Sequence, residues 1–374
     1  MPAGHREIIR TGEMGEKMNK RWLWRILILA AAAALCAGMV FVSRGEAPKS
    51  AGSLTLWYMQ EDCAPTVMQA LLESCRRDTG LRVEATAFSD EKSLGDAFEN
   101  GKPDLLFCNH FRAASLAERG NLSPLPEPRA FSDSLKTAGE EIGSSFFPIG
   151  GRLPVLLTNT ALSGESFESL EALLGAADTR PFVLSDDLSD LLFTAALSEG
   201  HWIKGEPEED KADYVFVSLY NMLAESAFLG GLRPMEEAAA YVRQGEVPCA
   251  ITRSTALAGI GDQDLRVSLL PLPEGGTKLY PAELMGFALL EGIYMPTAED
   301  FVEWLYGGIQ DSSAALRAGL VPIHAGAPGE NEIEKSLADF AQSGLVCFLA
   351  PDTAFYANRA DWEPHLRTAL DLLT

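Results

Sequence analysis

The sequence predicts an α/β protein of two lobes, each a mainly parallel sheet flanked by helices, joined by several strands. Short apolar runs of strand length end in polar residues and lead into segments with helical spacing, as in residues 101–125. Such units recur along the chain, and their linking helices are too long for hairpins, which favours parallel crossovers. The chain has 374 residues, which is long for one compact core, so two domains are expected.

Residues 1–50 are predicted to hold a cytoplasmic tail, a signal or anchor segment and a tether. Residues 26–42 form an unbroken apolar run preceded by basic residues, which is typical of a secretory signal peptide or a signal anchor. Cys36 lies in this run and is a candidate for lipidation, although Leu35 stands where lipoprotein processing needs a small residue. A retained anchor and an atypical lipoprotein both stay open. Either would tether the body to the outer face of the cell membrane.

Charge is distributed unevenly along the chain. The first 50 residues hold eight Lys/Arg and four Asp/Glu, so the rest holds 22 basic and 49 acidic residues, a net charge of −27. A body this acidic repels phosphate backbones, which argues against nucleic acid as a partner. The sign permits a cationic ligand, but a solvated surface kept soluble by repulsion is the simpler explanation.

No pattern in the sequence indicates a metal site, a cofactor or a catalytic centre. The five cysteines beyond the apolar run are odd in number and form no CxxC pair, so buried thiols are expected. The chain has no GxSxG, HExxH, Walker A or complete GxGxxG motif. We therefore expect a protein that is not an enzyme and has no cofactor.

The first lobe is assigned to residues 51–147 and 272–317. Alternating apolar residues, turn signals and helical spacing define its elements. The expected strands are 53–59, 82–88, 105–107 and 286–290, and the expected helices are 65–79, 94–100, 112–118 and 297–306.

The second lobe is assigned to residues 148–271 and 318–374. Its expected strands are 153–158, 181–184, 248–252 and 265–270, and its expected helices are 167–174, 189–199, 214–228, 235–242, 333–342 and 362–373. Residues 148–151, 271–276 and 319–322 are the expected passages between the lobes. Three passages make each lobe discontinuous and predict a hinge built from several strands.

Polar residues follow several predicted strands, at the kind of edge where open α/β sheets bind ligands. The candidate ligand-binding residues are Gln60, Glu61, Asp62, Asn109, His110, Arg112, Arg152, Asp186, Asp187, Arg253, Ser254, Thr255 and Trp362. Each of the four carboxylates precedes a predicted helix, so helix N-capping is the alternative role.

The other candidates also have structural alternatives. Asn109 and His110 could bind ligand by hydrogen bonds or merely end a strand. Arg112 and Arg253 could hold a carboxylate or sulfate bidentately, or pair within the protein. Trp362 could be a stacking platform or a core residue.

Short motifs occur in one order along the body. They are Leu54-Thr-Leu-Trp-Tyr58, Asp78-Thr-Gly80, Pro103-Asp-Leu-Leu-Phe107, Phe147-Pro-Ile-Gly150 with Leu156-Leu-Thr-Asn159, Gly245-Glu246 with Ala250-Ile251, and Phe301-Val-Glu-Trp-Leu305. Together they resemble the extracellular solute-binding proteins of ABC importers, the group that contains the maltose-binding protein. The resemblance implies a two-lobed, type II periplasmic-binding-protein-like fold. It also implies a monomer that binds a small polar solute in the inter-lobe cleft, closes by its hinge and docks on a membrane permease.

Carried over by position, the residues match the sugar binders only in part. Glu61 matches a carboxylate, whereas Asp62 replaces a lysine. Cys108 stands where those proteins have a stacking tryptophan. Phe111 replaces an aspartate, and Arg112 matches an arginine.

The resemblance also identifies two further platform positions. Thr255 stands at the second, and Trp362 is the best match to the third. Two of three platforms are missing, which argues against maltodextrin, although a carbohydrate-like solute of another kind stays open.

Two functional hypotheses follow. The first is an extracytoplasmic solute-binding protein of an ABC-type importer. The alternative is a membrane-anchored, divergent binding domain that acts as a sensor or structural surface protein without solute delivery. A secreted hydrolase would require two facing carboxylates across the cleft, for which the sequence gives no sign.

Overall fold

The computed structural model describes residues 53–125, 145–164, 166–176, 182–185, 221, 224, 225, 228, 232–235, 237–272, 280–324 and 326–349. The predicted helices 189–199 and 362–373 lie outside the described residues, as do Cys36, Asp186, Asp187 and Trp362. The described part of the predicted helix 214–228 is helical. No helix in the described ranges combines the length and apolar character needed to cross a membrane.

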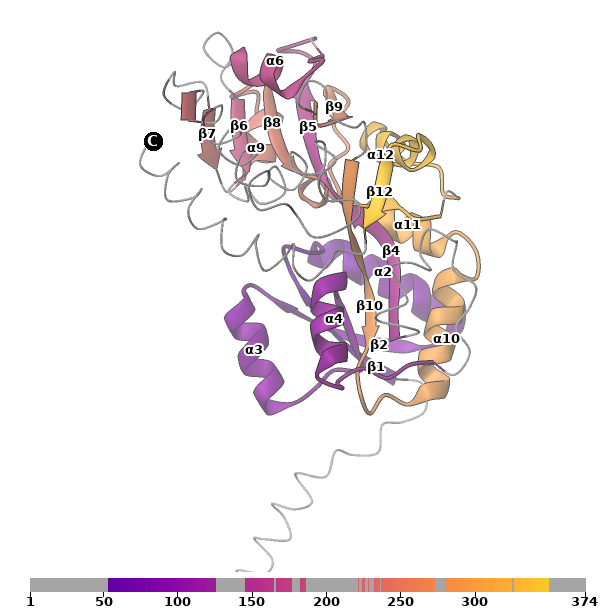
Figure 1. Ribbon diagram of the computed structural model, residues 1–374. Coiled ribbons are helices and arrows are strands. Elements are labelled where there is room, and N and C mark those ends of the chain that lie inside the picture. Colours follow the sequence, from indigo (N-terminus) through magenta and orange to yellow (C-terminus); the bar gives the residue numbers. More distant parts are fainter. Residues whose placement is uncertain are drawn as a thin grey trace, which may run out of the picture. The chain divides into compact units, whose positions relative to one another are not determined.

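Among the described residues, seven strands form the larger of two sheets (Figure 1). The order is β11-β4-β10-β3-β1-β2, with β12 also paired to β10. The bounds are β1 (Ser53–Met59), β2 (Arg82–Phe88), β3 (Leu105–Asn109), β4 (Phe146–Arg152), β10 (Tyr280–Leu289), β11 (Val321–Pro322) and β12 (Val346–Leu349).

The first three strands of this sheet are parallel, as the crossover helices between them predict. Strand β10 returns from the smaller sheet and runs antiparallel to both β3 and β4. The larger sheet is therefore more mixed than the predicted, mainly parallel one.

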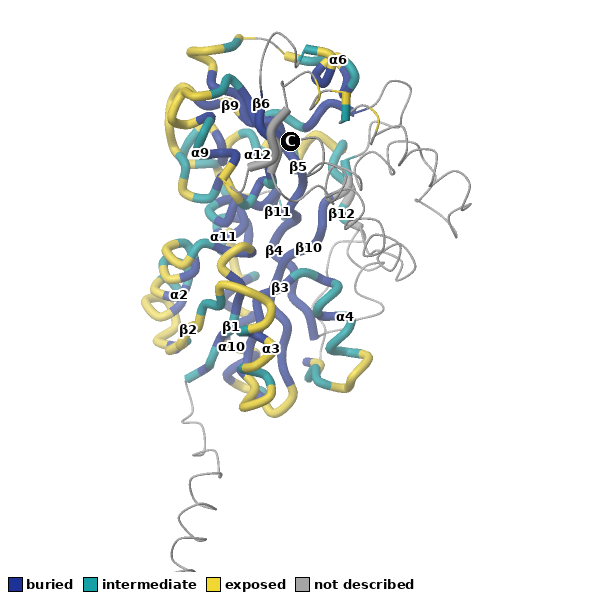
Figure 2. The backbone as a smooth tube through the Cα atoms, turned by 90° about the vertical axis from the view of Figure 1, so that its left-hand side faces the viewer, coloured by how far each residue is buried: buried dark blue, intermediate teal, exposed yellow. Residues whose placement is uncertain are grey.

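Helices cover both faces of the larger sheet. One face carries α2 (Pro65–Thr79), α10 (Met295–Tyr306) and α11 (Gln310–Arg317), and the other carries α3 (Glu91–Asn100) and α4 (His110–Glu118). Strand residues alternate between the faces: Leu105 and Phe107 enter the first core, and Leu106 and Cys108 enter the second. Figure 2 shows the resulting pattern, with buried strands between helices whose outer sides are exposed.

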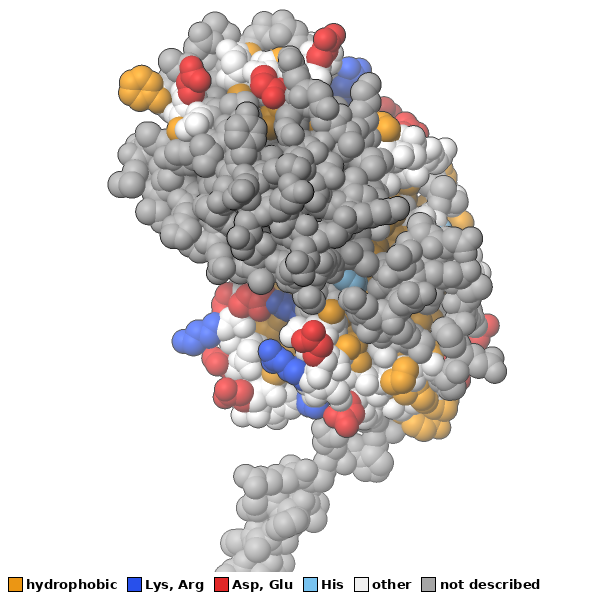
Figure 3. Space-filling view, in the orientation of Figure 1, with side chains coloured by type: hydrophobic (Ala, Val, Ile, Leu, Met, Phe, Trp, Pro, Cys, Tyr) orange, Lys and Arg blue, Asp and Glu red, His pale blue; other side chains and the backbone are white. Residues whose placement is uncertain are grey.

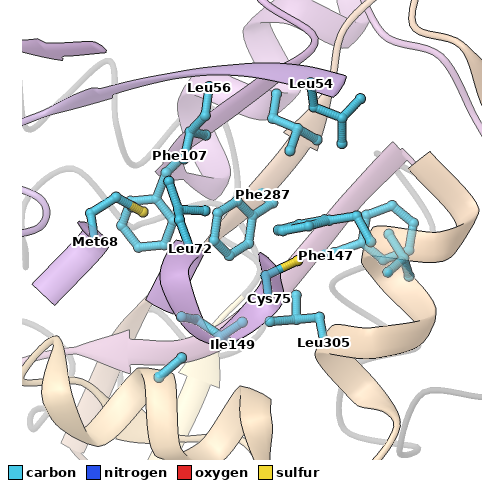
Figure 4. Close-up of a cluster of buried hydrophobic side chains, with 14 of the residues drawn as sticks. Leu54, Leu56, Met68, Leu72, Cys75, Phe107, Phe147, Ile149, Phe287 and Leu305 are labelled. Carbon is cyan, nitrogen blue, oxygen red and sulfur yellow. The ribbon is translucent and has the colours of Figure 1, made fainter. Parts of the chain in front are cut away.

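The core under α2 and α10 is dense with aromatic rings (Figure 4). The ring centroids of Phe107 and Phe287 lie 5.1 Å apart, and those of Phe287 and Phe301 lie 5.2 Å apart, both edge to face. These contacts join β3, β10 and α10, so this core fixes the position of the β3 end at which candidate site residues lie.

The smaller sheet holds five strands among the described residues, in the order β7-β6-β8-β5-β9. Its strands are β5 (Pro154–Asn159), β6 (Phe182–Ser185), β7 (Leu232–Met235), β8 (Cys249–Arg253) and β9 (Leu265–Leu269). The helices α9 (Ala238–Arg243) and α12 (Glu332–Gln342) pack on one core of this sheet, and α6 (Leu170–Gly175) is a further helix between β5 and β6. A 3-10 turn, η2 (Ser254–Leu257), follows β8.

The chain passes between the sheets through short connections. Only Leu153 separates β4 of the larger sheet from β5 of the smaller one. The strands β4, β11 and β12 all belong to the larger sheet, so sheet membership extends across the predicted lobe boundaries at 147/148 and 317/318. Those boundaries stay a proposal.

Several predicted elements need correction. The predicted helix 235–242 is wrong at its start, because Met235 ends strand β7 and the helix begins at Ala238. Strand β10 starts at Tyr280, six residues before the predicted strand. The structure also contains α11 and β12, which the sequence patterns did not indicate.

Candidate functional site

Candidate residues gather at the edge of the larger sheet where β1, β3 and β4 end. Asp62 lies in the turn after β1, Asn109 is the last residue of β3, and Arg152 is the last residue of β4. Arg152 binds Asp62 directly, and Glu283 of β10 connects Arg152 to Asn109. Polar residues from segments far apart in sequence thus form one cluster at the predicted ligand edge.

Arg152 is the centre of this cluster. Its Nη1 donates to Asp62 Oδ1 at 2.9 Å, and its Nε donates to Glu283 Oε2 at 2.5 Å. The other carboxylate oxygen of Glu283 accepts from Asn109 Nδ2 at 2.7 Å. Asp62, Arg152 and Glu283 are only 5%, 6% and 7% exposed, so the solvent screens this network weakly. The three ionised side chains hold two negative charges and one positive charge.

Burial governs the protonation of Asp62. Loss of hydration raises the pKa of the Asp62 carboxyl, an effect that Arg152 opposes and Glu283 reinforces. The pKa therefore stays above its ordinary value despite the direct ion pair. The positive charge of Arg152 reduces the repulsion between the two buried carboxylates. This role is structural and does not require a solute.

Arg112 brings a second guanidinium towards the same carboxylates. Its Nη2 pairs with Glu91 of α3, and burial lowers its pKa while Asp62 and Glu61 oppose that effect. Its Nη1 is buried and has no hydrogen-bond partner among the described residues. A donor left open in this way can donate a hydrogen bond to an oxygen atom of a solute or of a water molecule.

His110 lies just beside the cluster but is turned into the core. The residue is 1% exposed, and its ring contacts those of Phe111 and Phe146. Neither ring nitrogen has a hydrogen-bond partner within the described part of the chain. Burial lowers the pKa of His110 to about 4, with a small opposing effect of Glu283, so the ring is neutral at pH 7.

Helix capping, which was the alternative for the carboxylates, is not the role of those after β1, whereas Asn109 caps a helix although no such role was predicted for it. Asn109 Oδ1 accepts from the backbone N–H of Arg112 at 3.0 Å and caps α4. Helix α2 is preceded by Ala64 and starts with Pro65, with no side-chain cap. Asp62 instead binds Arg152, and Gln60 and Glu61 are exposed at the same edge.

The edge of the smaller sheet meets the cluster at the first passage. Ser254 exchanges two bonds with Leu153: its N–H donates to the Leu153 carbonyl at 2.9 Å, and its Oγ accepts from the Leu153 N–H at 3.3 Å. Arg253 pairs with Pro154 across β8 and β5, and Thr255 is half-buried in η2. Arg253 and Ser254 therefore pair with the two residues that follow Arg152 in the passage, and Thr255 comes next in the chain.

A close contact fixes this edge against α11. Gly319 follows α11 with φ +71°, and a Cβ atom there would lie 2.4 Å from the carbonyl oxygen of Ser254. Only glycine fits both the left-handed backbone and the approach.

Glu283 is the site residue that sequence reasoning missed. It lies in the part of β10 that was not predicted as strand, directly opposite Arg152 in the antiparallel register. A single charge within the otherwise apolar stretch 281–290 was the available signal, because a buried carboxylate requires a partner.

Nothing in the described site indicates metal or thiol chemistry. The described residues contain no group of three or more His, Cys, Asp or Glu placed to hold a metal ion. Burial, with Asp62 nearby, raises the pKa of Cys63 to about 12 and raises that of Cys108 well above its usual value. Both thiols therefore stay protonated at neutral pH.

The described surface of the larger-sheet region has mixed charge. On the face in Figure 3, acidic and basic side chains alternate over the described part of the larger-sheet region and form no continuous basic patch. The exposed ion pair Arg82–Glu84, at 2.9 Å on β2, is of this mixed kind. A surface of this type offers no concentrated positive charge to a phosphate backbone on the described part of this face.

Comparison with known proteins gives matches by structure alone. No protein-family model and no curated protein sequence matches the chain. The spermidine/putrescine ABC transporter substrate-binding protein PotD of Streptococcus pneumoniae matches with a TM-score of 0.63 and 13% identity, over 86% of this chain and 100% of that one.

Sugar-binding proteins match equally well. The maltose-maltodextrin binding protein of Alicyclobacillus acidocaldarius has a TM-score of 0.66 and 13% identity, over 85% of this chain and 94% of its own. The GacH receptor of Streptomyces glaucescens, solved unliganded and with acarbose, has a TM-score of 0.66 and 16% identity, over 86% and 94%. The chain thus has the type II periplasmic-binding-protein fold, which is the fold of ABC importer substrate-binding proteins, and the predicted fold class is confirmed.

Proposed function

We propose that this chain is an extracytoplasmic solute-binding protein of an ABC-type importer. It binds a small polar solute between the two lobes, closes by its hinge and presents the solute to the transmembrane subunits of a permease. The observation that carries this proposal is the fold, shared over most of the chain with binding proteins for polyamines and for maltodextrins. On the same basis the chain is not an enzyme.

The binding surface is proposed to lie on the two sheet edges that meet at Leu153. The larger sheet contributes Gln60, Glu61, Arg112 and the buried cluster around Arg152, and the smaller sheet contributes residues 253–255. Glu61 offers an exposed carboxylate, and Arg112 offers an unpartnered donor within the described residues. Asp186, Asp187 and Trp362 complete the proposed set. A solute with several hydroxyl or amine groups, including a carbohydrate-like one, fits this mixture of donors and acceptors.

The lobes of the proposed binding protein are residues 51–147 with 272–317 and residues 148–271 with 318–374. Closure would bend the passages at β4–β5 and around α11–β11. The protein would act as a monomer, held at the outer face of the cell membrane by the segment 26–42 or by a lipid on Cys36.

A second function is favoured by one specific observation. The positive charge of Arg152 is already bound by two buried carboxylates, so the strongest polar group at the edge serves the protein itself. A domain that keeps the fold but no longer delivers solute, and acts as a sensor or structural surface protein, would retain such a cluster. A neighbouring gene for a histidine kinase would favour this alternative, and neighbouring permease genes would favour the importer.

The test measures stabilisation and closure together. Purified residues 48–374 are screened against sugars, amines, peptides and anions, and a true solute raises the unfolding free energy by about 2.7 kcal/mol at a concentration 100 times its Kd. Small-angle scattering with the same solute should show a more compact particle. The importer proposal fails if every class leaves both the melting temperature and the scattering curve unchanged.

A further inference from the structure

A groove lies on the outer side of the larger sheet, where α2, α10 and α11 pack together. Two adjoining hollows form it, and both are lined by Trp304 and Gln310. Figures 1 and 2 show these three helices on one flank of the larger sheet. The groove contains none of the candidate solute-binding residues.

The more enclosed hollow has apolar side chains on part of its wall and Ser74, Gln310, Ser313 and Arg317 on the rest. Its volume is about 180 Å³, and Val67 and Leu71 of α2, Trp304 of α10 and Ala314 of α11 supply its apolar wall. These side chains belong to, or pack on, the core beneath, so the groove opens directly onto the hydrophobic core of the larger sheet. Ile309 also lines this hollow and is 50% exposed, so its side chain is accessible to a partner.

The broader hollow has an acidic edge. Its volume is about 610 Å³, and exposed Asp300 and Glu303 of α10 line it. Asp78 lies beside it and accepts from Trp304 Nε1 at 3.0 Å. The cation of the enclosed hollow, Arg317, is paired with Glu330 at 2.9 Å. Arg76 and Arg77 at the end of α2 do not line either hollow.

We propose that this groove is a docking surface for a segment of a partner protein that carries a bulky apolar side chain next to a Lys or Arg. The apolar side chain enters the enclosed hollow between α2 and α11, and the basic group lies along Asp300 and Glu303. The proposal does not depend on which solute binds at the sheet edges.

Volume and charge select this occupant. Pockets for whole small ligands usually measure about 300–1,000 Å³, so the enclosed hollow is small for a ligand and suits one anchoring side chain. Buried anchors of this kind supply most of the affinity in protein interfaces. An acidic segment would meet Asp300 and Glu303 on a chain whose net charge is already −23, which disfavours it.

The first test identifies what lies on the groove in cells that make this protein. A benzoylphenylalanine photo-cross-linker replaces Ile309 in the full chain, and a matched chain carries it at Tyr294. Both residues are 50% exposed, and Tyr294 lies at the opposite end of α10. We expect a discrete adduct from position 309 alone, and mapping of the cross-linked segment should show an apolar residue beside Lys or Arg. The proposal would be overturned if adducts formed equally at both positions. It would also be overturned if the cross-linked segment were acidic or came from a second copy of this chain.

The second test uses a synthetic peptide of the mapped segment and the full chain. Ile309→Glu and Asp300→Lys should each weaken peptide binding about tenfold, whereas Tyr294→Glu should leave it unchanged. Binding should also fall as salt is raised, since charged groups contribute. Each variant must unfold at the wild-type temperature, which separates a local effect from misfolding. Equal peptide affinity of wild type, Ile309→Glu and Asp300→Lys would contradict the docking surface and leave the solute-binding proposal untouched.

Discussion

Arg152 and Glu283 lie directly opposite each other on the antiparallel strands β4 and β10, and the Arg152 Nε donates to the Glu283 carboxylate at 2.5 Å. Asp62 binds the other side of the guanidinium. Because Arg152 is the last residue before the passage to the smaller sheet, this ion pair fixes the point at which the chain leaves the larger one. The hinge of the proposed binding protein therefore starts from a buried, charged anchor.

Replacing Arg152 by Met should destabilise the fold strongly. The change leaves Asp62 and Glu283 buried without their cation, and breaking such a pair from one side costs about 3–5 kcal/mol. Denaturant unfolding at pH 7 measures the loss. Arg243→Met is the matched control, because its pair with Asp262 at 2.7 Å is about half exposed and should contribute no more than about 1 kcal/mol.

The difference in unfolding free energy between wild type and Arg152→Met should become smaller as the pH falls. The pKa of Asp62 is already raised by burial, and removal of Arg152 takes away the effect that lowers it. The folded variant then binds protons more readily than the unfolded chain, so acid favours its folded state. The anchor role of the cluster would be contradicted if both arginine variants lost the same unfolding free energy. It would also be contradicted if the loss in Arg152→Met did not change with pH.

His110→Leu should reduce the dependence of the unfolding free energy on pH between pH 6.5 and pH 4. The pKa of His110 falls from 6.5 to about 4 on folding, so the unfolded chain binds the proton first as the pH drops. The wild-type protein therefore loses up to roughly 3 kcal/mol between pH 6.5 and pH 4 from this residue alone. The leucine variant lacks that loss of stability. At pH 8 it should be at least as stable as the wild type, because the substitution removes the two ring nitrogens of His110, which have no partner among the described residues. Unfolding free energies of both proteins from pH 8 to pH 4 test this, and parallel curves would contradict it.

Gly319→Ala should cost more than Gly344→Ala. Both glycines have positive φ values, +71° and +69°, so each alanine pays the left-handed backbone penalty of about 1–2 kcal/mol. At Gly344 nothing lies within 4 Å of the added Cβ, whereas at Gly319 the Ser254 oxygen lies 2.4 Å away. The Gly319 variant should lose about 1–3 kcal/mol more through overpacking. Thermal unfolding of the two variants measures the difference, and equal melting temperatures would contradict the close contact.

The described thiols should be unreactive in the folded protein. Cys63, Cys75, Cys108 and Cys249 are buried, and the pKa values of Cys63 and Cys75 are raised to about 12 and about 11. In residues 48–374 carrying Cys347→Ser, a thiol reagent at pH 8 should therefore label these four only after denaturant is added. Rapid labelling without denaturant would show that the core around the labelled cysteine opens in the folded protein.

Much of the fold was predictable because its local signals agree with one another. Strands β1 and β2 and helix α2 follow the sequence pattern, since alternation, Pro65 and Gly80 all indicate the same boundaries. Strand β7 was not predictable in this way, because Pro234 and its short length weaken the strand signal. Among the described strands it pairs with β6 alone and lies at the edge of the sheet, where a proline is tolerated.

The site was predictable only in outline. Residues at strand ends, such as Asn109 and Asp62, could be proposed because sheet edges bind ligands. The pairing of Arg152 with Glu283 depends on the register of two strands 131 residues apart, which no local pattern encodes. Asp62 binds the guanidinium of Arg152, and Ala64 occupies the N-cap position of α2.

The position of β10 has a consequence for how the chain can fold. It fills the place between β3 and β4, yet it follows all five described strands of the smaller sheet in sequence. As the chain is synthesised from its N-terminus, β3 and β4 keep open edges until residue 289 has emerged. The larger sheet is therefore begun first but cannot join β3 to β4 until the described strands of the smaller sheet have been made, and a chain cut short of this strand would expose two unpaired edges that invite aggregation.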